Sequence, residues 1–218
     1  MERSRIDTVM ISVPLMGGTG EAWSPREVTT ERMVLRPLSA ADRGAFIDLH
    51  RVSREHLSAW MPAPEDTGLN AGLEAYFERT LERNEAALRA GGSVRLAGFA
   101  RDGRMAGLFS LNNIVRGVGQ MGDAGWLVSA AFAGQGYATE GVRALIALAF
   151  EAWPVGLGLH RVQAGIIPRN ERSIRVAEKC GMRREGLALR YVRIAGVWED
   201  HYLYARTAEE GPCPGAPR

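Results

Sequence analysis

The chain has 218 residues, of which 46% are hydrophobic and 24% are charged, as is ordinary for a soluble globular protein. This length suits one domain with extensions. A formal net charge of +2 is too small to indicate nucleic acid as the principal ligand. The apolar stretch at residues 9–16 is interrupted by Ser12 and Pro14 and is too short to cross a bilayer. We therefore expect neither a nucleic-acid nor a membrane partner.

The first half of the domain alternates between strand and helix patterns. Apolar alternation predicts a strand over 33–38, and residues 39–42 offer a cap for the helix that follows. Helical spacing of apolar residues predicts a second helix over 69–90, ended by Gly91-Gly92. Strands over 94–100 and 105–111 flank Asp102-Gly103, the signal of a tight hairpin.

The second half continues in the same mixed manner. Its predicted elements are a strand over 123–128, a helix over 138–153, a strand over 161–167, a helix over 171–180, and strands over 187–194 and 197–205. This order predicts an α+β domain with a mixed, mostly antiparallel central sheet flanked by helices, rather than a doubly wound sheet.

Both ends of the chain have the composition of extensions. A Gly-Gly-Thr-Gly run at 17–20 and a Ser-Pro turn signal predict that residues 1–29 are flexible. Closely spaced prolines cannot continue a strand or helix, so we expect residues 207–218 to be a disordered tail. The domain itself should occupy residues 30–206.

The cysteines and histidines give no sign of a metal or disulfide site. Cys180 and Cys213 lack metal-ligand spacing and are too few for a disulfide framework, which predicts a reducing, cytoplasmic location. Cys180 continues an apolar helical pattern, which indicates a buried structural thiol rather than a nucleophile. His50 and His56 show no metal spacing, so we predict no metal.

The most informative segment is Gly134-Gln135-Gly136-Tyr137-Ala138-Thr139, which follows a predicted strand and opens a predicted helix. Its glycines allow the backbone to approach a ligand closely. A helix start presents unpaired N–H groups and a positive dipole end, which together bind phosphate. The segment predicts a diphosphate cradle, and Thr139 can add a hydroxyl. A glycine-rich turn that only caps the helix has equal support from the loop alone.

Two other phosphate motifs are disfavoured at this loop. A Walker loop requires Lys followed by Ser or Thr after its last glycine, and no such Lys is present. A dinucleotide fingerprint requires Gly or Ala where Thr139 stands. It also requires an acidic residue near the end of the next strand. In this chain that strand ends at Ile167-Pro168-Arg169, which contains no acidic residue.

The loop resembles part of a known signature. Gly134-x-Gly136-x-Ala138 is similar to the second part of the acetyl-CoA signature of GNAT enzymes, Arg/Gln-x-x-Gly-x-Gly/Ala. Ala133 departs from that pattern, because it stands at the leading Arg or Gln. The departure removes a side-chain contribution to cofactor binding and leaves the backbone N–H groups in place.

Three further landmarks resemble the RimJ/RimL-type subfamily of GNAT enzymes. Residues 168–182, with Asn170, Ser173 and Gly181-Met182, are similar to its Asn-x-x-Ser…Gly-Phe segment. Residues 30–38 resemble its opening strand, and residues 56–62 resemble its next landmark. Together with the loop, the landmarks keep the family's order over residues 30–204. The resemblance implies the GNAT fold, with a sheet splayed at the acetyl-CoA site.

The resemblance also implies direct transfer of acetyl from the acetyl-CoA thioester to an amine. In the family, a backbone N–H on the strand before the cradle stabilises the oxyanion, which maps to Leu127 or Val128. That strand's free edge also pairs with the cofactor's pantetheine arm. A serine at the place of Ser173 supplies or orients the proton for the leaving thiolate, and Asn170 lies near the cofactor. On the residues alone, Asn170 caps its helix and Ser173 faces solvent.

The general base is left open by the sequence. Asp123, Glu199 and His201 are candidates, and Asp200 and His201 alternate faces, so only one can point into a cleft. Tyr191 and Tyr202 are candidates for the cleft wall. Ser173, Asp123 and Tyr191 are the catalytic candidates that we carry forward.

The acceptor is the least determined part of the prediction. Residues 60–62 and the helix from residue 69 are expected to form one wall of its cleft, with core packing of Trp60 as the alternative. We expect a protein or peptide N-terminal α-amine as acceptor and a monomer or homodimer as the working form. The alternatives are a small amine (amino acid, polyamine or antibiotic), a non-catalytic acyl-CoA-binding domain, or a nucleotide-binding module.

Overall fold

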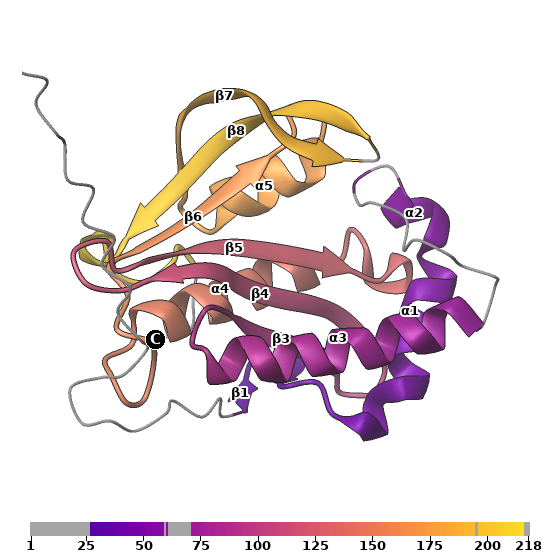
Figure 1. Ribbon diagram of the computed structural model, residues 1–218. Helices are drawn as coiled ribbons and strands as arrows, with labels where there is room; N and C mark the ends of the chain where they lie inside the picture. Colours follow the sequence, from indigo (N-terminus) through magenta and orange to yellow (C-terminus); the bar gives the residue numbers. More distant parts are fainter. Residues whose placement is uncertain (1–26, 59, 61–70, 195, 216–218) are drawn as a thin grey trace, which may run out of the picture.

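A computed structural model describes residues 27–58, 60, 71–194 and 196–215 (Figure 1). Within these residues one sheet contains eight strands in the order β1-β2-β3-β4-β5-β6-β8-β7. The strands are β1 (Val28–Thr29), β2 (Met33–Arg36), β3 (Val94–Ala100), β4 (Met105–Val115), β5 (Met121–Val128), β6 (Arg161–Ile166), β7 (Arg183–Ile194) and β8 (Val197–Thr207). The helices are α1 (Arg43–Val52), α2 (Arg54–Ser58), α3 (Ala71–Arg89), α4 (Tyr137–Phe150) and α5 (Glu171–Lys179).

The pairing of β5 with β6 divides the sheet. It is the parallel pair in an otherwise antiparallel sheet, because α4 connects the two strands as a crossover. Only residues 121–123 of β5 pair with residues 161–163 of β6, and beyond them the strands separate. The predicted mixed, mostly antiparallel sheet is confirmed, and the splay lies at the ends of these two strands (Figure 1).

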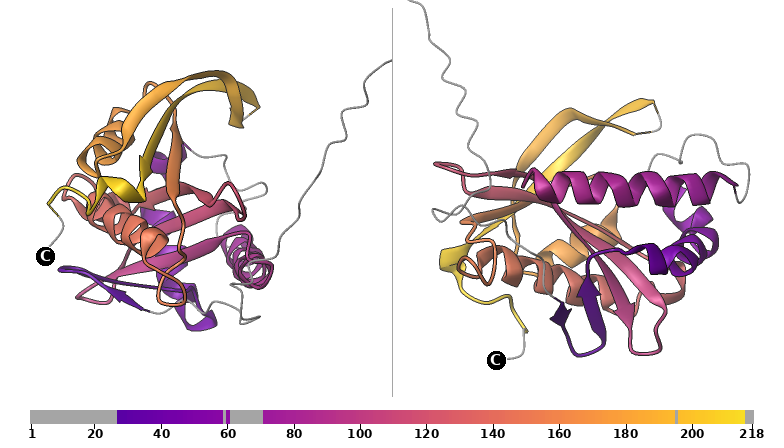
Figure 2. Two further views of the ribbon diagram at one scale, coloured as in Figure 1. Left: turned by 90° about the vertical axis from the view of Figure 1, so that its left-hand side faces the viewer. Right: turned by 60° about the horizontal axis from the view of Figure 1, so that its bottom comes forward.

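Helices cover both faces of the sheet (Figure 2). On one face α4 packs closely on β4, because Gly141 has no side chain where the ring of Phe109 lies; a Cβ there would stand 2.2 Å from that ring. On the other face α1 and α3 bury Phe46 and Phe77 against Ala97 of β3. The two helix layers hold the β3–β4–β5 half of the sheet rigidly between them.

Several predicted element ends are confirmed, and α4 is shorter than expected. Gly91 follows α3 with φ +68°, and Gly103 turns the β3–β4 hairpin with φ +83°. The helix predicted over 138–153 ends at Phe150. Pro154 disfavours helical backbone at the residue before it, and the N–H of Leu157 folds back to the carbonyl of Leu148.

Both predicted domain boundaries differ from the structure. At the amino end, Val28 and Thr29 belong to the sheet as β1, so the ordered domain begins before residue 30; residues 1–26 lie outside the described residues. At the carboxyl end, the prediction of a disordered tail from 207 is wrong for residues 207–215. β8 continues to Thr207, a 3-10 turn spans Ala208–Glu210, and Cys213 is buried. Buried contacts outweigh the local effect of the prolines there.

Candidate active site

A cleft of about 840 Å³ opens where β5 and β6 separate. Its walls come from β5, the loop before α4, α5, β6, the β7–β8 pair and the segment around α2. The predicted site residues in these walls are Asp123, Leu127, Val128, Gly134, Gly136, Ala138, Thr139, Asn170, Ser173 and Tyr191. The split in the sheet therefore brings together residues that are far apart in the chain.

The loop from Gly134 to Thr139 has the geometry of an anion cradle. Gly134 and Gly136 have φ of +76° and +88°, a region in which side chains are strained, and Gly136 is the N-cap of α4. Within the described residues, no group accepts a hydrogen bond from the backbone N–H groups of residues 134–139. These donors and the dipole of a 14-residue helix fit a diphosphate.

A partly buried set of hydrogen bonds braces the cradle from behind. The Glu140 carboxylate, in the first turn of α4, accepts hydrogen bonds from the Thr30 hydroxyl (2.6 Å), the Arg32 N–H (2.8 Å) and Arg32 Nε (2.7 Å). Burial alone would raise the pKa of Glu140, but the hydrogen bonds from Thr30 and Arg32 outweigh it and lower that pKa. The ionised Glu140 therefore fixes the start of α4 to the turn between β1 and β2.

Arg32 also contacts the loop itself. Its Nη1 donates to the carbonyl of Gln135 at 2.8 Å, and its guanidinium lies 4.5 Å from the ring centroid of Tyr137. A cation thus stands beside the cradle although residue 133 carries none. The sequence pattern missed this contact, because Arg32 and Gln135 are 103 residues apart in the chain.

The free edge of β5 supplies the backbone groups that the resemblance implies. The Leu127 carbonyl points toward β4, since a Cβ on Gly107 of β4 would lie 2.4 Å from its oxygen. Successive residues of a strand direct their backbone groups to opposite sides. The N–H of Val128 is therefore directed into the split, and that of Leu127 toward β4.

Asn170 and Ser173 both line the cleft from the start of α5. Asn170 Oδ1 accepts the Ser173 backbone N–H at 3.1 Å, which confirms the helix-capping interpretation of Asn170. The cap uses the main chain of Ser173, so its hydroxyl is not committed to it. Ser173 is partly buried in the cleft wall rather than facing bulk solvent.

Asp123 lies at the narrow end of the split, at the last paired position of β5. Its two oxygens accept hydrogen bonds from Asn113 Nδ2 and Gln163 Nε2, each at 2.8 Å. Neutral amides thus hold a negative charge in the cleft wall, where it can attract a cationic amine.

A β-bulge brings Tyr191 into the cleft. Residues 189–191 of β7 oppose the single residue Asp200 of β8, whose carboxylate accepts the Arg190 N–H at 2.7 Å. The extra residues bend the strand and direct Tyr191 over Gly165 of β6. No local sequence pattern predicted this bulge.

The remaining candidates for the general base and the cleft wall differ in their positions and partners. His201 is buried in the cleft wall, with its ring 5.7 Å from that of Tyr191. Glu199 instead forms a two-point ion pair with Arg169 at 2.7 and 2.8 Å, and this hydrogen bonding lowers the pKa of Glu199. Tyr202 lies on the other side of β8, with the Arg184 guanidinium 4.6 Å from its ring centroid.

The segment around α2 closes one side of the cleft. His56 Nδ1 lies 3.4 Å from Arg172 of α5, and the Trp60 ring centroid lies 5.8 Å from the Arg169 guanidinium. The expectation that Trp60 contributes to a cleft wall is confirmed; Met61 and Pro62 lie outside the described residues. The same expectation for the following helix is wrong, because α3 packs on the far face against β3.

Neither a metal site nor a membrane span is found in the part of the chain that the structure describes. That part has no group of three or more His, Cys, Asp and Glu side chains placed to bind a metal ion. Its helices include none with the length and apolarity needed to cross a bilayer.

A family model for the acetyltransferase (GNAT) domain matches residues 32–183. The chain belongs to the GNAT acetyltransferase family. The resemblance of the sequence to the GNAT family is thereby confirmed, and the chain is an N-acetyltransferase.

Several known GNAT proteins match nearly the whole domain. A Bacillus subtilis protein described as the probable N-acetyltransferase YjcK is 44% identical over 177 residues, which cover 78% of this chain and 91% of that protein. The [ribosomal protein uS5]-alanine N-acetyltransferase of Escherichia coli is 26% identical, with 84% of this chain and 91% of that protein covered. The structure of Mycobacterium smegmatis RimJ in complex with CoA-disulfide aligns with a TM-score of 0.76 and 28% identity over 84% of this chain and 85% of RimJ.

Proposed function

We propose that this N-acetyltransferase transfers the acetyl group of acetyl-CoA directly to the N-terminal α-amine of a protein or peptide. The observation that carries the proposal is the set of N–H groups at residues 134–139, which have no acceptor among the described residues and belong to a loop that lines the cleft. The acceptor class is supported by the relative from Escherichia coli that acts on an alanine of ribosomal protein uS5.

Acetyl-CoA binds, in this proposal, with its diphosphate on the main chain of Gly134, Gln135, Gly136, Tyr137, Ala138 and Thr139. Its pantetheine arm lies along the free edge of β5, between β5 and β6, and passes Asn170. Arg172, Arg175 and Lys179, on the cleft side of α5, supply positive charge in the same cleft. A polyanionic cofactor complements these charges.

The proposed chemistry uses groups along the two walls of the split. The developing oxyanion accepts a hydrogen bond from the main chain at Leu127–Val128, and the direction of the Val128 N–H favours that residue. The carboxylate of Asp123 attracts the acceptor ammonium, and Tyr191 forms the wall beside it. Ser173, at the start of α5, provides the proton that the leaving thiolate requires.

A small amine is the second candidate acceptor. Asp123 is bound in the described structure only by neutral amides, so its charge is available to any ammonium, whether of a peptide or of a polyamine. The acceptor class must therefore be tested directly.

The experiment is an acceptor screen with acetyl-CoA. Release of the CoA thiol is measured with peptides that carry a free or a blocked N-terminus, with amino acids and with spermidine, and mass spectrometry locates the acetyl group. Turnover that requires the free peptide N-terminus supports the proposal. Turnover on small amines alone assigns the second acceptor class. CoA binding without turnover on any amine overturns the enzymatic function and assigns an acyl-CoA-binding role.

A further inference from the structure

His201 occupies an unusual position for a polar side chain. It is 5% exposed, yet it forms part of the cleft wall on β8. The absence of a side chain at Gly165 leaves the space in which the rings of His201 and Tyr191 meet, since a Cβ at residue 165 would contact both rings. The imidazole is therefore held between β6 and β7 and lines the cleft that Asp123 and Ser173 also line.

The hydrogen bond of His201 fixes its tautomer. Nδ1 lies 3.0 Å from the carbonyl oxygen of Glu199. A carbonyl oxygen only accepts hydrogen bonds, so Nδ1 carries the hydrogen. In the neutral ring Nε2 then holds the lone pair, and no described residue donates to it. The main chain thus prepares His201 to accept a proton at Nε2.

The other candidates for the general base either already accept hydrogen bonds or are weak bases. Each oxygen of Asp123 already accepts an amide hydrogen bond, and the Glu199 carboxylate is held by Arg169 at two points. Tyr191 carries a phenol, a poor base in its neutral form. His201 is the candidate whose acceptor atom is both oriented and without a partner in the described structure.

We propose that Nε2 of His201 is the general base of the transfer, an inference that rests on the proposed acetyltransferase function. One proton passes from the acceptor ammonium to Nε2, and the free amine forms a C–N bond with the thioester carbonyl carbon. As the C–S bond breaks, the Ser173 hydroxyl gives its proton to the departing sulfur. The nitrogen then gives its second proton to the Ser173 oxygen, which restores the hydroxyl. The products are the acetamide, CoA thiol and one proton, which His201 returns to solvent.

The test is the pH dependence of kcat/KM in His201 variants. His201→Asn keeps an N–H that can donate to the Glu199 carbonyl and removes Nε2. We expect kcat/KM at pH 7 to fall about 100-fold, with the deficit shrinking at high pH because the acceptor amine then loses its proton unaided. The Kd of acetyl-CoA should stay within about twofold, because His201 contributes nothing to the cradle.

In the described part of the chain, the titratable and charged groups recorded beside His201 come from β7 and β8 and from the partner of Glu199. They are Tyr191 of β7 and Glu199 of β8 with its partner Arg169, while β6 contributes the uncharged Gly165. His160→Gln is the matched control, because this half-exposed histidine pairs with Glu209 outside the cleft and should leave the profile unchanged.

Chemical rescue separates a proton-transfer role from a structural one. His201→Ala leaves a space beside Gly165, and added imidazole should restore turnover at low pH, with unfolding in urea as a check on folding. A deficit that is equal at every pH, or that imidazole does not relieve, would overturn the assignment while acetyl transfer by the wild type stands. A wild-type protein that acetylates no amine would overturn both proposals.

Discussion

At the scale of single residues, the backbone conformation of two glycines decides whether the cradle exists. Gly134 and Gly136 have positive φ, so the loop can turn its N–H groups outward before α4 begins. Gly136 is also confined by packing, since a Cβ there would lie 3.2 Å from Arg32 Nη2. A side chain at residue 136 would therefore strain the loop and displace the brace behind it.

Gly136→Val should raise the Kd of acetyl-CoA by at least about tenfold, because a β-branched residue at φ +88° distorts the cradle. Gly103→Val is the matched control, since Gly103 has φ +83° but turns a hairpin away from the cleft. Both variants should lose stability in urea, and only Gly136→Val should lose affinity in calorimetry. Equal affinity in the two variants would remove the cradle assignment.

Ser173→Ala should lower kcat about 10- to 100-fold and leave the Kd of acetyl-CoA nearly intact. The cap of α5 uses the Ser173 backbone N–H, which alanine keeps, so stability should change little. Turnover and binding are measured on the same preparation. Unaltered turnover would exclude the hydroxyl as the proton source.

At the scale of elements, the start of α4 is joined to the turn before β2 by one partly buried carboxylate. The Glu140 carboxylate accepts hydrogen bonds from Thr30 and Arg32, which lie more than 100 residues earlier in the chain. The negative charge also lies in the first turn of the helix, where the dipole favours it. This single residue therefore links the position of the cradle to the edge half of the sheet.

Glu140→Gln should lower the free energy of unfolding by about 1–2 kcal/mol at pH 7, because charge-assisted hydrogen bonds are lost. The pKa of Glu140 is lowered in the folded protein, so its stabilisation is complete above the ordinary value of 4.5 and is lost as the pH falls through the folded pKa. The difference between wild type and variant should accordingly disappear in acid. Urea unfolding at both pH values measures it.

The control for this experiment is Glu78→Gln at the exposed Arg43–Glu78 ion pair. Surface pairs contribute little, so its stability should stay close to that of the wild type at either pH. A pH-independent loss of stability in Glu140→Gln would show that shape, rather than charge, joins α4 to the turn before β2.

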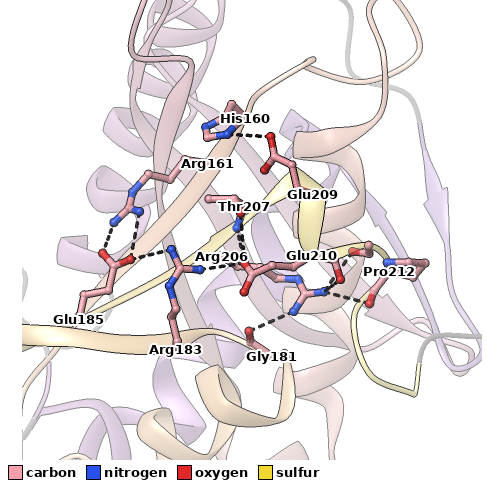
Figure 3. Close-up of polar contacts among 11 residues, drawn as sticks. His160, Arg161, Gly181, Arg183, Glu185, Arg206, Thr207, Glu209, Glu210 and Pro212 are labelled. Carbon is pink, nitrogen blue, oxygen red and sulfur yellow. Dashed lines mark hydrogen bonds and ion pairs between the residues drawn. The ribbon is translucent and has the colours of Figure 1, made fainter.

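At the scale of the whole molecule, the carboxyl-terminal segment is part of the domain. Arg206 is 4% exposed and donates to the carbonyls of Gly181, Glu210, Gly211 and Pro212 at 3.0–3.1 Å. Figure 3 shows this guanidinium among them, beside the pairs that Arg183 forms with Glu185 and Glu210. The segment is thereby fixed to the end of α5, next to Cys180.

Arg206→Lys should destabilise the protein by about 2–3 kcal/mol, because an ammonium cannot reproduce the planar set of donors. It should also expose Cys213 to a thiol reagent, whereas Cys180, whose pKa burial raises to about 12, should react only on unfolding. Arg183→Lys, at an exposed guanidinium, serves as the control and should affect both readouts less. Equal stability of the two variants would show that the segment is not anchored by Arg206.

What the sequence determined was mostly local. The glycines of the cradle, the hairpin at Gly103 and the cap at Asn170 depend on the backbone of a few successive residues, so their types were sufficient to predict them. The order of elements likewise predicted the sheet type, because a strand–helix–strand unit between hairpins produces one parallel pair.

Only the tertiary structure decided which side chains meet in the cleft. Alternation along β8 left the faces of Asp200 and His201 open, and the pairing with β6 and the bulge in β7 placed His201 beside Tyr191. The contacts of Arg32 with the cradle and of Arg206 with the tail also join distant segments. Such contacts depend on strand register and burial across the whole sheet, which no short stretch of sequence contains.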